Sequence, residues 1–167
     1  MPWLKSTFLL DPREPACISS ASCASRTEVI ALDENEVVAA LCRHLTAAGY
    51  RVHQQLSTTQ QGVDVIAESP SGKMLYVEAK GATSSREGSA RFGKGFNASQ
   101  VFDRVAKGLY TGLCLRADHP DADKEDVALA FPDTPDFRKR LEPIRKQLSD
   151  AGVDVYLASA DGTVTRL

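Results

Sequence analysis

GVDVIAESPSGKMLYVEAKG, residues 62–81, consists of two apolar runs joined by a turn. Residues 62–68 and 74–80 are rich in Val, Ile, Leu and Tyr, the residue types that favour strands. Between them, Ser69-Pro70-Ser71-Gly72 favours a turn. Together with a third such run, Arg51–Leu56, this pattern predicts a meander of three strands.

Asp64, Glu78 and Lys80 are ionisable residues within these apolar runs. Side chains alternate along a strand, so Glu78 and Lys80 share a face, and the hairpin brings Asp64 back alongside Glu78. Burying such charges is costly unless they pair with each other or with a metal. A four-residue loop would place Asp64 opposite Val77, so we expect a β-bulge or a loop of odd length centred on Ser71.

The remaining elements follow from periodicity and capping signals. Asp33 and Glu36 have the spacing of a capping box, and a helix is predicted from there to Gly49. The other expected elements are a helix from Asn97 to about Leu109, a strand at Val127–Phe131, a helix at Pro135–Asp150, a strand at Val153–Ala158 and a short edge strand after Asp161-Gly162. The order α-β-β-β-α-β-α-β predicts an α/β domain over residues 28–167, with a mixed sheet flanked by helices. Residues 1–27 lack periodicity and are expected to form an N-terminal arm or edge element.

The composition is that of a chain that forms one domain with a substantial core. The chain has 167 residues, of which 43% are hydrophobic. No run approaches the roughly 20 apolar residues of a membrane helix, and the opening lacks the pattern of a secretory leader, so we expect a cytoplasmic protein without membrane contact. The four cysteines form no C-x-x-C pair and are expected to be reduced.

Positive charge is concentrated in residues 80–110, which contain six basic and two acidic side chains although the net charge of the chain is −2. Three of the basic residues, Arg86, Arg91 and Lys94, lie in the glycine-rich segment 81–96, which reads as a mobile loop. Arg104 and Lys107 follow on one face of the next helix. These five are candidates for binding nucleic-acid phosphates, and a solvated loop and helix face is the alternative.

The stretch around Asp64, Glu78 and Lys80 resembles the PD-(D/E)XK superfamily, which includes restriction endonucleases, Holliday junction resolvases and Mrr-like nucleases. The resemblance spans roughly residues 33–158, and the family core has the order α-β-β-β-α-β. It implies that Asp64 and Glu78 coordinate magnesium, or manganese, and that the carbonyl of Ala79 adds a ligand. It also implies that Lys80 orients or deprotonates the attacking water. Val63 stands where the name-giving motif has proline.

The resemblance adds two further candidates. Glu36 occupies the helix position where many relatives place an additional metal-binding carboxylate, but pure helix capping by Glu36 is an equal alternative, and Glu34 is a weaker candidate for the same role. Gln100 matches the first residue of a Q-x-x-x-Y signature that is catalytic in some relatives, whereas Arg104 replaces its tyrosine.

The sequence therefore predicts a magnesium-dependent nuclease that hydrolyses phosphodiester bonds in DNA, and the choice of DNA over RNA comes from the resemblance. The alternative is a non-catalytic nucleic-acid-binding or assembly module that retains the nuclease fold. Two buried carboxylates argue against that alternative, because they would repel an approaching polyanion. No separate target-reading domain is expected, so recognition would depend on a homodimer, on DNA structure or on a partner protein.

Overall fold

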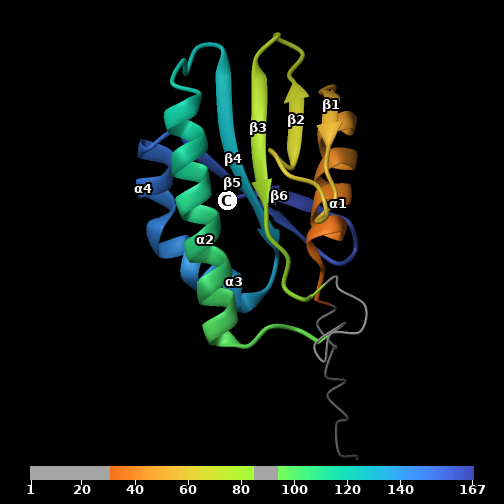
Figure 1. Cartoon of the computed structure of the whole chain (residues 1–167), viewed down its shortest axis with the longest axis vertical. Coiled ribbons are helices and arrows are strands. Elements are labelled where there is room, and N and C mark those ends of the chain that lie inside the picture. The colour runs from red at the N-terminus through yellow and green to blue at the C-terminus, as the bar shows by residue number, and fades with distance from the viewer. Residues whose placement is uncertain (1–30, 85–93) are drawn as a thin grey trace, which may run out of the picture.

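Six strands form one mixed sheet in chain order (Figure 1). The computed structural model describes residues 31–84 and 94–167, and the predicted arm at 1–27 lies outside this part of the chain. The strands are β1 (Arg51–Gln55), β2 (Val65–Glu68), β3 (Met74–Ala79), β4 (Glu125–Pro132), β5 (Val153–Ala158) and β6 (Val164–Arg166). The β3/β4 and β4/β5 pairs are parallel, and the other three are antiparallel. The predicted α/β class with a mixed sheet is confirmed.

The helices cover the two faces of this sheet. They are α1 (Glu34–Ala47), α2 (Ala98–Asp118), α3 (Pro135–Leu141) and α4 (Arg145–Asp150), with a 3₁₀ turn, η1 (Glu142–Ile144), between the last two. The first helix lies on one face, and the other three lie on the opposite face (Figure 1). None of the described helices is both long and apolar enough to cross a membrane.

Alternation along β3 assigns its side chains to the two layers. Leu75, Val77 and Ala79 are buried in the core beneath α1. Because side chains alternate, Tyr76 and Glu78 face the α2 side of the sheet. The α1-facing core thus fixes the direction of Glu78.

Helix α2 is longer than the sequence predicts, ending at Asp118 rather than near Leu109. Glycine weakens an isolated helix, but Gly108 and Gly112 are the points at which this helix approaches the sheet. A Cβ atom on Gly112 would lie 2.8 Å from Leu129 Cδ2, and one on Gly108 would lie 2.8 Å from Phe131 Cζ. Tertiary packing therefore extends the helix past both glycines.

The single helix predicted over residues 135–150 is wrong, because the chain forms α3, η1 and α4 in succession. Pro143 lies in the 3₁₀ turn between the two helices. Proline has no N–H group to donate to the carbonyl of Lys139, four residues earlier, so the α-helical ladder is interrupted there.

Candidate functional site

The hairpin register brings Asp64 and Glu78 to the same face of the sheet. Val65 pairs with Val77 and Glu68 with Met74, which leaves five residues, 69–73, in the loop. The predicted loop of odd length centred on Ser71 is confirmed. The same register, continued by one residue beyond β2, sets Asp64 opposite Glu78.

Hydrogen bonds join these residues at the carboxyl end of β3. Asp64 Oδ2 accepts from the Ala79 N–H at 2.7 Å. Lys80 Nζ donates to the Glu78 carboxylate and, at 2.7 Å, to the Ala79 carbonyl oxygen. The Lys80 and Glu78 side chains are each only 13% exposed, so this is a largely buried ion pair. The structure thus brings together four of the six residues at which the sequence analysis placed catalysis or metal binding: Asp64, Glu78, Ala79 and Lys80.

Glu34, rather than Glu36, is the α1 carboxylate that reaches this cluster. Glu34 Oε2 lies 3.9 Å from Lys80 Nζ. Glu36 is exposed, and its Oε2 accepts from the Asp33 N–H at 2.7 Å in the capping box. The contacts of Glu36 are therefore those of a helix cap, and its assignment as a metal ligand stays a prediction without geometric support.

Gly81 explains why Glu34 lies so close to Lys80. A Cβ atom on Gly81 would lie 2.5 Å from the Glu34 backbone nitrogen and 2.7 Å from the Asp33 carbonyl carbon. The following residue, Ala82, donates its N–H to Leu32 O at 2.7 Å. The chain leaving β3 therefore lies directly against the start of α1, a contact that only glycine permits.

We expect Gly81→Ala to destabilise the fold by about 1–3 kcal/mol, because the added methyl group would push against backbone rather than against a flexible side chain. The free energy of unfolding in urea measures this. Gly95→Ala is the matched control, since its Cβ would meet only Ala31 Cβ at 3.5 Å, an ordinary contact. Equal stabilities of the two variants would contradict the close approach at Gly81.

Burial and neighbouring carboxylates raise the pKa of Asp64 from 3.8 to about 6. Loss of solvent is the largest cause, and the negative charges of Glu78 and Glu34 add to it. The Ala79 N–H and the Lys80 ammonium act in the opposite direction. Burial, followed by the charge of Glu78, also raises the pKa of Glu34, against the attraction of Lys80. Three carboxylates therefore share the Lys80 ammonium and, at Glu34, the attraction of Arg104, which still leaves an excess of negative charge suited to a cation.

Asp64→Asn is expected to be more stable than the wild type at pH 7, with the difference shrinking as the pH falls from 6 to 4. The folded-state pKa of Asp64 lies above the ordinary value, so its ionisation destabilises the fold as the pH rises through this window. Thermal unfolding without added divalent metal measures the difference. Asp161→Asn is the control, and it should be less stable than the wild type at pH 7, because hydrogen bonds from Thr163 lower the pKa of Asp161 and its ionisation stabilises the fold. A pH-independent difference for Asp64→Asn would contradict the raised pKa.

The donor types in this cluster fit magnesium. Carboxylates of Asp64, Glu78 and Glu34 and the carbonyl of Ala79 are hard oxygen ligands, which magnesium prefers. In residues 31–84 and 94–167, no three His, Cys, Asp or Glu side chains are already arranged around a metal position. The Lys80 ammonium binds both Glu78 and the Ala79 carbonyl, so a metal sharing those two oxygens requires it to shift.

A polar pocket of about 230 Å³ adjoins the cluster. It is lined by Glu34, Thr58, Gly81, Thr83, Ser84 and Arg104. The Arg104 guanidinium lies 5.0 Å from the centre of the Phe96 ring, a cation–π contact that holds it at the pocket wall. A guanidinium beside hydroxyl groups is suited to binding a phosphate oxygen.

The two ends of the connection between β3 and α2 are hydrogen-bonded to each other. Phe96 donates its N–H to Ala82 O at 2.8 Å, and the Thr83 hydroxyl donates to Lys94 O at 2.9 Å. Lys94 is thereby held near the pocket, although its contact there is made by the backbone. The predicted phosphate-binding residues Arg86 and Arg91 lie outside the described part of the chain.

Gln100 and Lys107, the two other candidates on α2, are placed by the structure as follows. The Gln100 side chain accepts from the Asn97 N–H at 3.1 Å, and the Gln100 N–H donates to Asn97 Oδ1 at 3.0 Å, so the two form a capping box. Its signal, Asn followed three residues later by Gln, was present in the sequence. Lys107 is exposed to solvent.

Comparison of the chain with protein-family models, with curated proteins and with solved structures finds no match. What supports a function is therefore the arrangement of the side chains themselves. The features that bear on it are the buried Lys80–Glu78 pair, the adjoining Asp64 and Glu34 carboxylates, and the pocket lined by Arg104.

Proposed function

We propose that the chain is a metal-dependent nuclease of the PD-(D/E)XK type that hydrolyses phosphodiester bonds in DNA. The observation that carries the proposal is the convergence of Asp64, Glu78 and Lys80 at the carboxyl end of β3, on the face shared with α2. The order α1-β1-β2-β3-α2-β4 supports it, because it is the core order that the resemblance implies. The preference for DNA over RNA rests on that resemblance.

In this proposal Asp64, Glu78 and the Ala79 carbonyl hold magnesium, and Glu34 is the nearest additional carboxylate. A magnesium ion held there supplies Lewis-acid chemistry: it polarises the phosphate and makes bound water more acidic. Hydrolysis forms a bond from a water oxygen to phosphorus and breaks one P–O ester bond. Lys80 orients that water and stabilises the charge that develops on the phosphate oxygens, because its ammonium lies among the ligand oxygens without being a ligand.

The pocket beside the metal ligands is proposed to hold a phosphate of the substrate backbone. Arg104 supplies the charge, and the stack on Phe96 reduces the number of conformations that its side chain loses on binding. Lys94, Arg86, Arg91 and Lys107 remain candidates for more distant phosphates. Because these contacts are electrostatic, DNA affinity should fall steeply with salt.

A second candidate is the non-catalytic nucleic-acid-binding or assembly module. The observation that favours it is the Lys80–Glu78 ion pair, in which each charge has a partner without any metal. In that case the cluster would be a structural network, and Asp64 would serve only as an acceptor for the Ala79 N–H.

Calorimetric titration of magnesium, combined with a cleavage assay, separates the two candidates. Duplex, branched and single-stranded DNA and a matched RNA are the substrates. The nuclease is expected to bind magnesium and to cut at least one DNA substrate only when magnesium or manganese is present. A wild-type chain that binds no divalent metal at millimolar concentration and cuts none of the substrates would overturn the nuclease in favour of the binding module.

A further inference from the structure

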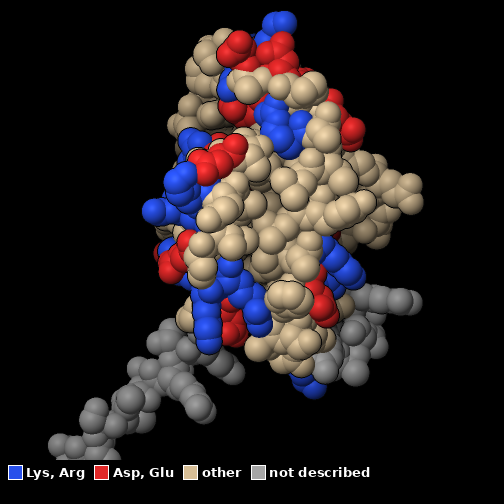
Figure 2. Space-filling view, turned by 90° about the vertical axis from the view of Figure 1, so that its left-hand side faces the viewer, with Lys and Arg blue, Asp and Glu red and all other residues tan. Residues whose placement is uncertain are grey.

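One side of α2 presents large apolar side chains to solvent. Phe102, Tyr110 and Leu113 are 56%, 74% and 49% exposed, and they are the exposed large hydrophobic residues of the described chain. Figure 2, which views the side of the molecule with α2 and α4, shows a broad uncharged area bordered by charged side chains. An exposed patch of this kind on a folded domain marks an interaction surface.

The apolar side of α2 has the spacing of a helix–helix seam. Phe102, Ala106, Leu109 and Leu113 follow one another at intervals of four, three and four residues. This is the spacing of the a and d positions with which one helix packs along another. The buried residues Val101, Val105 and Leu115 lie on the neighbouring side of the helix, against the sheet.

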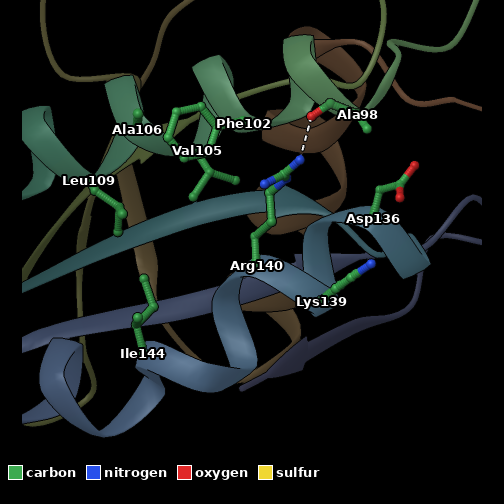
Figure 3. Close-up of a pocket in the computed structure, with 9 residues that line it drawn as sticks. All are labelled: Ala98, Phe102, Val105, Ala106, Leu109, Asp136, Lys139, Arg140 and Ile144. Atoms are coloured by element: carbon green, nitrogen blue, oxygen red, sulfur yellow. Dashed lines mark hydrogen bonds between the residues drawn. The ribbon is translucent and has the colours of Figure 1, made fainter.

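A groove of about 530 Å³ lies beside this seam, between α2 and the α3–η1 segment (Figure 3). Phe102, Val105, Leu109 and Ile144 give it an apolar lining, and Asp136, Lys139 and Arg140 lie along its α3 side. Arg140 is fixed there, because it donates to Ala98 O at 2.6 Å and its guanidinium lies 5.3 Å from the centre of the Phe102 ring. The groove is therefore a defined receptor for an apolar side chain.

We propose that a second copy of the chain covers this surface, in a two-fold homodimer in which the two α2 helices run antiparallel and cross at Ala106. A two-fold interface must be complementary to itself. The small side chain of Ala106 permits close approach at the axis. Phe102 and Tyr110 lie four residues to either side of Ala106, so Phe102 of each copy meets Tyr110 of the other beside the groove.

Charge complementarity favours the antiparallel arrangement. Asp103 and Lys107 are both exposed on the same flank of the seam, one on each side of Ala106 along the helix. In an antiparallel pair, the same flanks face each other, so Asp103 of each copy lies within reach of Lys107 of the other. In this dimer Lys107 pairs with Asp103 of the other copy and is not available to bind phosphate. Arg104 is then the phosphate-binding residue of α2. The inference does not depend on the nuclease activity, because it concerns the side of α2 away from Asp64 and Glu78.

The alternative occupant is the N-terminal segment of the same chain, which contains Trp3, Leu4, Phe8 and Leu9. A segment held in the groove would cover Phe102 and Leu109 but would leave Tyr110 and Leu113 exposed, since neither lines the groove. A second α2 helix covers all four residues. The self-complementary charges and the length of the seam therefore favour the second copy.

Sedimentation equilibrium of the full chain tests the proposal. The wild type should have twice the mass of one chain, and Tyr110→Glu with Leu113→Glu should raise the dissociation constant by at least about 100-fold, because both changes place charge within the apolar interface. Gln147→Glu with Ser149→Glu is the matched control: it adds the same charge at exposed positions of α4 and should leave the dimer intact. Circular dichroism verifies that each variant is folded.

A charge exchange tests the register. Asp103→Lys and Lys107→Asp should each weaken the dimer, and the two changes together should restore it, because the pair is re-formed with opposite signs. Ala106→Cys, in a chain whose Cys17, Cys23 and Cys114 are serine, should form an intermolecular disulfide, whereas Gln147→Cys in the same background should not.

Three results would overturn the proposal. The first is a monomeric wild type at a concentration of about 100 µM, well above the dissociation constants of specific homodimers. The second is a dimer that the Tyr110→Glu and Leu113→Glu changes leave unaffected, which would place the interface on another surface. The third is a monomer in which the fluorescence emission of Trp3, the single tryptophan, responds to the groove alone. In that case Leu109→Glu would shift the emission to the red, and Tyr110→Glu with Leu113→Glu would leave it unchanged. This result would assign the groove to the N-terminal segment.

Discussion

Lys80→Ala is expected to lower the rate of DNA cleavage by about 10³-fold while holding or raising magnesium affinity, because the ammonium that occupies the Glu78 and Ala79 oxygens has gone. The Lys80 ammonium donates to Glu78 and to the Ala79 carbonyl, so in the proposed nuclease it would lie beside the reacting phosphate without supplying a ligand atom. Cleavage under single-turnover conditions measures the rate, and calorimetric titration of magnesium measures the affinity. Together they separate chemistry from metal binding.

Lys73→Ala is the matched control for this change. Lys73 belongs to the same hairpin, but its Nζ pairs with Asp126 at 2.7 Å, at the opposite end of β3 from Lys80. Its loss should leave cleavage unchanged. If Lys80→Ala and Lys73→Ala cleave equally well, Lys80 has no part in the reaction.

Glu78→Gln is expected to weaken magnesium binding by at least about 100-fold and to reduce cleavage by more than about 10³-fold, because a charged ligand becomes a neutral one. Glutamine keeps an oxygen that can accept from Lys80, so the change removes charge with little loss of packing. Binding of DNA in the absence of metal should hold or improve, since a carboxylate that repels phosphate has gone. Calorimetry and a filter-binding assay in a chelator measure these quantities.

Glu68→Gln is the matched control for Glu78→Gln, because it also replaces a carboxylate with an amide. Glu68 lies at the far end of β2 on the same face as Glu78, where it pairs with Arg51 and His53. This variant should bind magnesium and cleave as the wild type does. Undiminished magnesium affinity in Glu78→Gln would contradict the proposed metal centre and favour the ion-pair network of a binding module.

The hairpin and the positions of its charged residues could be predicted from the sequence, because they depend on local alternation. Once Asp64, Glu78 and Lys80 were required to share a face, only some loop lengths remained, and the five-residue loop is one of them. The capping pair Asp33 and Glu36 was likewise visible as a local pattern.

The features that the sequence analysis missed, or to which it gave less weight, depend mainly on contacts between distant segments. Glu34 is the carboxylate near Lys80 because Gly81 packs against the start of α1, and no local pattern links residues so far apart in the chain. The length of α2 was underestimated for a related reason, since Gly108 and Gly112 weaken a helix in isolation but fit the sheet beneath it. The break at Pro143, by contrast, was a local signal that the apolar periodicity of residues 135–150 concealed.

The hydrogen bond between Phe96 and Ala82 makes the β3–α2 connection a natural place to alter the protein. This bond joins the two ends of the connection. The positions of Lys80 and Arg104 are therefore set by β3, by α2 and by the bond, rather than by the number of residues between Ala82 and Phe96. Doubling the length of a connection between two fixed ends costs only about 0.6 kcal/mol in closure entropy. A peptide tag or a small target-binding domain inserted after Ser84 should therefore leave Asp64, Glu78, Lys80 and Arg104 in place, which would let a chosen recognition element be joined to them.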